Sequence, residues 1–135
     1  MRISIAKAID LLLAGQVVAL PTETVYGLAA CLSNKAAIEK LFQLKTRPAD
    51  NPLIVHVAHV KSIYDLVTTV PENFERVLTF WPGPLTVVLP ANPKHVPEIV
   101  RAGLPTVAIR IPNQKQILKV ISQTGPLVAS SANFS

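Results

Sequence analysis

Short apolar runs alternate with helical patterns along the whole chain, and this alternation constrains the fold more than any other feature of the sequence. Three of the runs stop at Pro21, Pro90 and Pro112, and proline marks strand ends because it cannot donate to a sheet ladder. An α/β domain built on a twisted, mixed sheet is therefore predicted. The expected strands are Val17–Leu20, Leu53–Val57, Leu85–Leu89, Thr106–Ile111 and Leu127–Ser131.

Apolar residues at spacings of three and four predict helices between these strands. Ser4, Ser33 and Asn113 precede helical patterns as N-caps, and Gly15 and Gly125 follow the first and last patterns as stop signals. Two further patterns, Val60–Val67 and Pro71–Phe80, are also expected to be helical. The residues expected to face the core are Ile5, Ala8, Ile9, Leu12, Leu13, Ala37, Ile38, Leu41, Phe42, Phe74, Val77, Leu78, Ile117, Leu118 and Ile121.

Composition limits the class of protein. The 135 residues fit one domain, half of them are hydrophobic, and no apolar run is long enough to span a bilayer. The N-terminus lacks the pattern of a signal peptide and lone Cys31 excludes an internal disulfide, so a cytoplasmic protein is expected. The formal net charge of +5 suits a nucleotide or RNA partner. Because the basic residues are scattered, a mildly basic enzyme is an equally good interpretation.

Two polar segments are candidate binding loops. The segment Pro21–Leu28 (PTETVYGL) places hydroxyls and a carboxylate after a strand, which suits a small polar ligand; an ordinary turn is the alternative. Lys45 and Arg47, before Pro48, put two cations at a helix end, where they suit a polyphosphate. The alternative is that the helix C-terminus simply favours cations there. The sequence contains no Walker glycine loop, so side chains and strand ends would hold any nucleotide.

Two polar side chains interrupt apolar strands. Alternation in Thr106–Ile111 places Thr106 and Arg110 on one face and Ile109 on the other. Because a buried unpaired arginine is unfavourable, Arg110 needs an anionic ligand or an internal salt bridge, and both interpretations stay open. His56 ends another apolar run, where a lone histidine is more often a satisfied core residue than a ligand. His, Cys and carboxylate residues show no metal-ligand spacing, so no metal site is expected.

Two later segments complete the set. In Phe80–Thr86 (FWPGPLT) a structural corner is the favoured interpretation, with Thr86 pointing into a site as the alternative. In Ala129–Ser135 (ASSANFS) small polar residues follow an apolar strand, as in ligand-facing strand ends. A capped helix start is the other interpretation, and the two are compatible because a helix N-terminus binds anions.

Taken in order, the segments PTETVYGL, KTRP with NPLIVH, FWPGPLT, TVAIRIP and SSANFS resemble the YrdC/TsaC family, the threonylcarbamoyl-AMP synthases. The resemblance runs from about Val17 to Ser135. It implies a mostly parallel sheet, flanked by helices, around a concave basic cavity. It also implies that L-threonine, bicarbonate and ATP, with Mg²⁺ on the phosphates, give threonylcarbamoyl-AMP and pyrophosphate. A partner complex would then transfer the threonylcarbamoyl group to the adenosine at position 37 of tRNA.

The resemblance also implies a threonine pocket and a nucleotide pocket. Thr24, His56 and Arg110 would surround the threonine, with Arg110 on its carboxylate, and Thr22 and Tyr26 are weaker candidates for the same cavity. Two cations, Lys45 and Arg47, are the expected catalytic residues because they would hold the reacting phosphates. The implied ATP-binding residues are Lys45, Arg47, Asn51, Thr106, Ala129, Ser131 and Asn133.

The family's last motif continues beyond Ser135, so residues 1–135 are expected to form one YrdC-like domain that lacks its C-terminal part. The main alternative function is a non-catalytic YrdC-like module that grips double-stranded RNA or tRNA. A carbamoyl-transfer domain of hydrogenase maturation is less favoured, because those chains carry zinc-finger modules and this one has a single cysteine.

Overall fold

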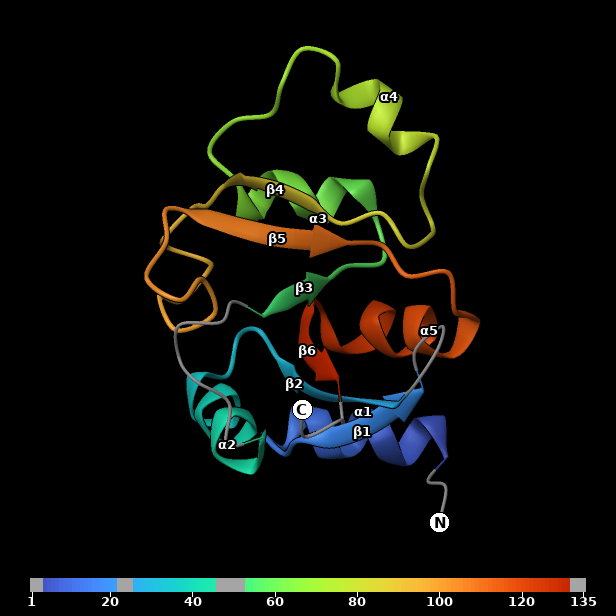
Figure 1. Cartoon of the computed structure of the whole chain (residues 1–135). Helices are drawn as coiled ribbons and strands as arrows, with labels where there is room; N and C mark the ends of the chain where they lie inside the picture. Colours follow the sequence, from blue (N-terminus) through green and yellow to red (C-terminus); the bar gives the residue numbers. More distant parts are fainter. Residues whose placement is uncertain (1–3, 22–25, 46–52, 132–135) are drawn as a thin grey trace.

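The computed structural model describes residues 4–21, 26–45 and 53–131, which form one six-stranded sheet flanked by helices (Figure 1). The α/β class and all the expected strand regions are confirmed. The strands are β1 (Val18–Pro21), β2 (Tyr26–Cys31), β3 (Ile54–His56), β4 (Val87–Pro90), β5 (Thr106–Arg110) and β6 (Leu127–Ser131). The helices are α1 (Ile5–Leu13), α2 (Lys35–Lys45), α3 (Val60–Leu66), α4 (Phe74–Leu78) and α5 (Lys115–Thr124).

The strands follow the order β1-β2-β6-β3-β5-β4. Among the described strands, β3 and β5 pair in parallel and the other four pairings are antiparallel. The sheet is mixed, as predicted, but the expectation of a mostly parallel sheet is wrong. Segment 22–25 is too short for the crossover that parallel neighbours need. Strand β6 returns from α5 and enters between β2 and β3, antiparallel to both.

Helix α1 begins and ends where the sequence predicts. Ser4 Oγ accepts a hydrogen bond at 3.1 Å from the backbone N–H three residues later, and Gly15 adopts φ 85° just after the helix end. Ala8 and Leu12 are 2% and 1% exposed and face the core. Leu13 is 60% exposed, so the prediction that it faces the core is wrong. The helix packs through a narrow stripe, and Leu13 lies beyond the edge of that stripe.

Helices α2 and α5 are capped by residues other than the predicted ones. Asn34 and Gln114 accept hydrogen bonds at 3.0 and 2.7 Å from the backbone N–H groups three residues later. The predicted caps, Ser33 and Asn113, each stand one residue too early. Two adjacent polar residues precede each helix, and only the backbone geometry selects between them. Within the described ranges, no helix combines the length and the apolar character needed to cross a bilayer.

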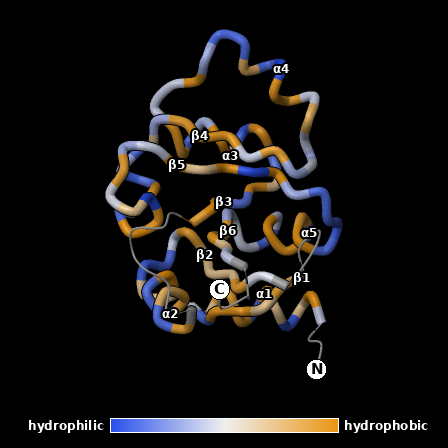
Figure 2. The backbone as a smooth tube through the Cα atoms, viewed as in Figure 1, coloured by the Kyte–Doolittle hydropathy of each residue, from blue (hydrophilic) through white to orange (hydrophobic). Residues whose placement is uncertain are grey.

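Strand alternation divides the apolar side chains between two cores, one on each face of the sheet. One core joins α1 and α5 to β1, β2 and β6, and the other joins α2, α3 and α4 to strands that include β3 and β5. Val55 and Ile109 are fully buried in the second core. Because neighbours along a strand point to opposite faces, His56 and Arg110 point to the first face. Figure 2 shows hydrophobic residues along the strands and polar residues around α4.

Strand β2 is an element that the sequence does not predict. It contains Gly27, Ala29 and Ala30, whose small side chains give little β propensity, and it begins inside the expected binding loop. In the sheet it pairs with β1 on one side and β6 on the other. Pairing on both sides and burial therefore supply the stability that local propensity does not.

Helices α1 and α5 cover one face of the sheet over β1, β2 and β6, and the same face is more exposed to solvent beyond β6. Ile54 of β3 and Ala108 of β5 point to this face and remain half-buried, and Val88 of β4 is 62% exposed. Figure 1 shows α5 beside β6, with β5 and β4 farther along the sheet. Among the described residues, this face therefore keeps partly exposed side chains over β3, β5 and β4, and we call this part of the sheet the open face.

Candidate active site

Strands β3 and β5 place His56 and Arg110 side by side. The two strands pair in parallel, and the register sets His56 opposite Arg110. Paired strands lie about 4.8 Å apart, so both side chains are within reach of one small ligand. Their neighbours Val55 and Ile109 are both 0% exposed in the opposite core. The strand alternation predicted for Thr106–Ile111 is therefore confirmed, and it puts both polar side chains on the open face.

The guanidinium of Arg110 is held by a loop that is distant in sequence. Its Nε donates a hydrogen bond to the carbonyl oxygen of Gly83 at 3.1 Å. Gly83 in turn donates its backbone N–H to the carbonyl oxygen of Ile111 at 2.9 Å. The Arg110 side chain is half-buried. An oriented guanidinium on an open face suits a carboxylate ligand, because arginine presents a planar fork of donors.

His56 is buried, with 8% of its surface exposed. Its Nδ1 lies 3.2 Å from the carbonyl oxygen of Ile54, two residues earlier on the same strand. The ring borders a recess of about 10 Å³, whose other walls include Gly27, Ala29 and Ala129. That volume holds about one water-sized group. A small substituent of a bound ligand would therefore fit beside His56.

Two further predicted residues, Ala129 and Thr106, lie on the same face away from Arg110, and the backbone of a third is in register with them. Ala129 is paired with Ile54, which is also paired with Ala108 of β5. Thr106 precedes Arg110 by four residues, so the two lie about 13 Å apart at ~3.3 Å per residue. Ser131, the last residue of β6, is paired through its backbone with Gly27, in register with the same end of the sheet as Thr106, but its side chain lies outside the described residues. The two ends are spaced to bind different parts of one elongated ligand.

Several predicted site residues fall where no description is possible. Thr22, Thr24, Arg47, Asn51 and Asn133 lie outside the described residues. Lys45 is the last residue of α2 and Tyr26 the first of β2, but their side chains lie outside the description too. The phosphate end of the site therefore stays a prediction. Of the three residues predicted to surround threonine, the structure describes His56 and Arg110 and sets them opposite each other; their role as a threonine site also stays a prediction.

Cys31 is buried in the core between the sheet and α1. Its Sγ donates a weak hydrogen bond to the carbonyl oxygen of Leu12 at 3.4 Å. Burial raises the pKa of the Cys31 thiol above its ordinary value of 9.0, because the thiolate would lose its hydration. A catalytic thiol requires the opposite shift. Cys31 is therefore a core residue, in agreement with its absence from every motif.

The open face is poor in acidic groups. Strands β3, β5 and β6, with sequences IVH, TVAIR and LVASS, contain no aspartate or glutamate. Across residues 4–21, 26–45 and 53–131, no cluster of three His, Cys, Asp or Glu side chains is placed to hold a metal ion. The described strands therefore offer backbone, hydroxyl and cationic groups to a ligand rather than a carboxylate cage.

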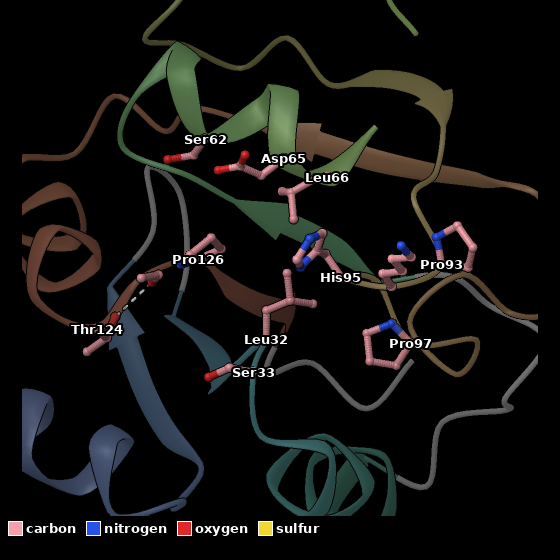
Figure 3. Close-up of a pocket in the computed structure, with 12 residues that line it drawn as sticks. Leu32, Ser33, Ser62, Asp65, Leu66, Pro93, His95, Pro97, Thr124 and Pro126 are labelled. Atoms are coloured by element: carbon pink, nitrogen blue, oxygen red, sulfur yellow. Dashed lines mark hydrogen bonds between the residues drawn. The ribbon is translucent and has the colours of Figure 1, made fainter. Parts of the chain in front are cut away.

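A larger cavity of about 780 Å³ lies elsewhere, between the β2–α2 turn, α3 and the α5–β6 turn (Figure 3). Asp65 of α3 lies on one side and His95 on another, and both are exposed. Thr124 at its edge donates its hydroxyl to the carbonyl oxygen of Gly125. Among the residues that the structure describes, none of the predicted site residues lines this cavity. Its size therefore says nothing in favour of a catalytic role.

Two groups in the site escape prediction from the sequence. The carbonyl of Gly83 comes from the segment Phe80–Thr86, for which a structural corner was the favoured interpretation and Thr86 the only residue considered for a site. The recess beside His56 depends on Gly27 and Ala29 of the unpredicted strand β2. The Gly83 carbonyl has a detectable sequence signal in the Gly-Pro turn. The recess has no such signal, since it arises from how β2 packs in the sheet.

Comparison with known proteins gives a consistent result. Residues 10–135 match the model of the Sua5/YciO/YrdC family, which is described as "Telomere recombination". The threonylcarbamoyl-AMP synthase of Bacillus subtilis is 47% identical over 133 residues, covering 97% of this chain and 38% of that protein. The threonylcarbamoyl-AMP synthase of Vibrio vulnificus is 38% identical over 136 residues, covering 98% of this chain and 73% of that protein.

A solved structure also matches the fold along the whole chain. The crystal structure of P. abyssi Sua5 complexed with L-threonine has a TM-score of 0.92 and 44% identity, covering 100% of this chain and 41% of that chain. The chain spans well under half the length of the Bacillus relative and of this Sua5. The comparisons thus concern a region of those proteins, and within it they cover nearly the whole of this chain.

Proposed function

This chain belongs to the Sua5/YciO/YrdC family, and on that premise we propose that it forms threonylcarbamoyl-AMP and pyrophosphate from L-threonine, bicarbonate and ATP. The observation that carries the proposal is the pairing of His56 with Arg110 on the open face of the sheet. A relative of the same fold, 44% identical to this chain, is complexed with L-threonine, which supports an amino acid as the ligand.

The threonine would be held by its carboxylate. Arg110 would donate to the carboxylate oxygens while Gly83 fixes its Nε, so the cation meets its ligand in one orientation. His56 and Thr24 would lie beside the amino acid. The recess next to His56 has about the size of one methyl group, which fits the methyl of the threonine side chain but not the whole side chain.

The reaction needs positioning and charge neutralisation rather than a covalent nucleophile. The threonine amine attacks carbon dioxide derived from bicarbonate, forming a carbamate and releasing a proton. A carbamate oxygen then attacks the α-phosphorus of ATP, and the bond to pyrophosphate breaks. Carbamates are short-lived in water, so a site that excludes water would favour the second step.

The nucleotide would occupy the other end of the open face. Lys45, Arg47 and Asn51 would bind the phosphates and offset the negative charge that develops on phosphorus. The rest of the nucleotide pocket would be formed by Thr106, Ala129, Ser131 and Asn133. The distance of about 13 Å between Thr106 and Arg110 leaves room for an adenylate joined to an amino acid.

Magnesium belongs to the proposal as part of the ATP substrate. Mg²⁺ prefers carboxylate, phosphate and water oxygens, and usually keeps several waters. Strands β3, β5 and β6 provide no carboxylate, so the described residues do not fit a protein-held Mg²⁺. The ion would arrive on the triphosphate, where it supplies further charge neutralisation.

The product would be consumed by a separate threonylcarbamoyl-transfer complex that modifies the adenosine at position 37 of tRNA in the cytoplasm. The alternative, a non-catalytic module that binds double-stranded RNA or tRNA, is less favoured because the relatives are named as synthases. The two functions differ in what they need from the site, since RNA binding requires cations but neither threonine nor ATP turnover.

The direct test is pyrophosphate release from the purified chain with ATP, bicarbonate and Mg²⁺, with and without L-threonine. We expect pyrophosphate only when threonine is present, and we expect Arg47→Gln to abolish it. Arg76→Gln, an exposed cation on α4, is the matched control and should leave the rate unchanged. ATP turnover that is indifferent to threonine would contradict the synthase. Salt-sensitive RNA binding without turnover would support the alternative.

A further inference from the structure

The loop from Phe80 to Thr86 makes two hydrogen bonds with the end of β5. Gly83 accepts from Arg110 Nε at 3.1 Å and donates to the carbonyl oxygen of Ile111 at 2.9 Å. Gly83 is buried. The residue that fixes the Arg110 guanidinium is thus itself fixed to the backbone next to Arg110. Any displacement of Gly83 would therefore turn the guanidinium.

A single side chain closes this loop. The indole Nε1 of Trp81 donates to the carbonyl oxygen of Leu85 at 2.7 Å, which spans Gly83 from one side to the other. The loop is also tight, because a Cβ on Gly83 would lie 2.6 Å from the carbonyl oxygen of Phe80. The position of the Gly83 carbonyl therefore depends on the Trp81–Leu85 hydrogen bond and on the absence of a side chain at Gly83.

Trp81 is anchored on its other side by aromatic packing. Its ring meets that of Phe74 edge-on, with centroids 6.2 Å apart, and Phe74 meets Tyr64 in the same way at 6.4 Å. Phe74 is 3% exposed in the core that underlies α3 and α4. Edge-to-face contacts fix both the place and the tilt of a ring. The indole N–H is thus held toward Leu85 by the core rather than by the loop alone.

We propose that Trp81 is a positioning residue for the amino-acid substrate: its N–H closes the loop that presents the Gly83 carbonyl to Arg110. The inference rests on the proposed function, in which Arg110 binds the threonine carboxylate. Trp81 does not touch the substrate in this scheme. It acts through Leu85 and Gly83 by reducing the orientations that Arg110 samples before binding.

The experiment removes the indole N–H and little else. Trp81 is the only tryptophan of the chain, so biosynthetic replacement of tryptophan by benzothienylalanine changes this position alone and keeps the ring shape. We expect the KM for L-threonine to rise about 3- to 10-fold, the effect of one hydrogen bond, with kcat within about twofold. Trp81→Phe and Gly83→Ala should raise KM at least as much. Phe80→Leu, in the same loop but 64% exposed, is the matched control and should leave KM unchanged.

A purely structural role for Trp81 gives a different pattern. Partial unfolding lowers the active fraction, so kcat would fall while KM stays constant, and that result would overturn the proposal. An unchanged KM in the benzothienylalanine protein would overturn it as well. L-Threoninol, which lacks the carboxylate, serves as a competing ligand whose inhibition constant should not change with the replacement.

Failure of the proposed function can be told apart from failure of this inference. Absence of threonine-dependent pyrophosphate in the unmodified chain would contradict the function. Calorimetric titration of L-threonine without ATP then measures the Arg110 contact directly. Equal affinities in the unmodified and benzothienylalanine proteins would reject the positioning role whatever the outcome with ATP.

Discussion

Two adjacent residues of β5, Ile109 and Arg110, allow a test of whether strand alternation separates a core residue from a substrate-binding residue. Ile109 is 0% exposed in the core, whereas Arg110, one residue later, is half-buried on the open face. The substitutions Ile109→Ala and Arg110→Ala should therefore affect different properties. The first should mainly lower stability, and the second should mainly lower the affinity for the substrate. The pair is matched, because both shorten a side chain at the end of the same strand.

The stability effects follow from burial. Removing three carbons from a fully buried isoleucine destabilises a domain by about 3 kcal/mol, through lost transfer energy and the cavity left behind. For a chain of this size that lowers the Tm by roughly 10 °C. Arg110→Ala removes the hydrogen bond to Gly83, worth about 1 kcal/mol, and the loss of that bond lowers the Tm by about 4 °C.

For substrate affinity, Arg110→Ala should have the larger effect of the two substitutions. A charge-assisted contact to a carboxylate contributes about 2–3 kcal/mol, so Arg110→Ala should raise the KM for threonine about 30- to 150-fold. Ile109→Ala, measured well below its Tm, should keep KM within about twofold. Pyrophosphate release and thermal unfolding provide the two readouts. A folded Arg110→Ala protein with an unaltered threonine KM, or an Ile109→Ala protein with an unaltered Tm, would refute the reasoning for that residue.

Two smaller predictions concern single side chains in the fold. Because burial raises the pKa of Cys31, the unfolded chain binds fewer protons at this thiol than the folded chain does above pH 9.0, so the free energy of unfolding falls as pH rises from 9.0 toward the folded pKa. Urea titrations from pH 8 to 10 should show a flatter dependence of the free energy of unfolding on pH for Cys31→Ala than for the unchanged chain. Equal slopes in the two proteins would reject the burial effect. Gln114→Ala should lower the free energy of unfolding by about 1 kcal/mol through loss of the α5 cap, whereas the exposed control Gln123→Ala should not; equal denaturation midpoints for both would contradict the capping role.

The sequence alone predicts which side chains of a strand share a face, for one physical reason. Side chains alternate along a strand whatever its neighbours are, so the sequence of β5 already separates Ile109 from Arg110. Likewise the helical spacing and Gly15 locate α1, because helix geometry and left-handed glycine are local properties. The order of the motifs identified the family without any knowledge of contacts.

The tertiary structure decided which strands and which side chains pair with each other. Strand β6 lies between β2 and β3, and β2 itself forms only because both its edges are paired. The partner of Arg110 Nε lies 27 residues away, at Gly83, and no spacing rule connects the two. The caps at Asn34 and Gln114 depend on backbone angles that two adjacent polar residues leave undecided.

The sequence by itself determined which side chains share a face and which family the chain resembles, since both depend on the identity of residues and their local period. The folded chain alone decided that His56 stands opposite Arg110, that the Gly83 carbonyl holds the guanidinium, and that the sheet is chiefly antiparallel. Those outcomes depend on contacts between distant segments, whose free energy is set by the packing of the whole sheet rather than by any stretch of it.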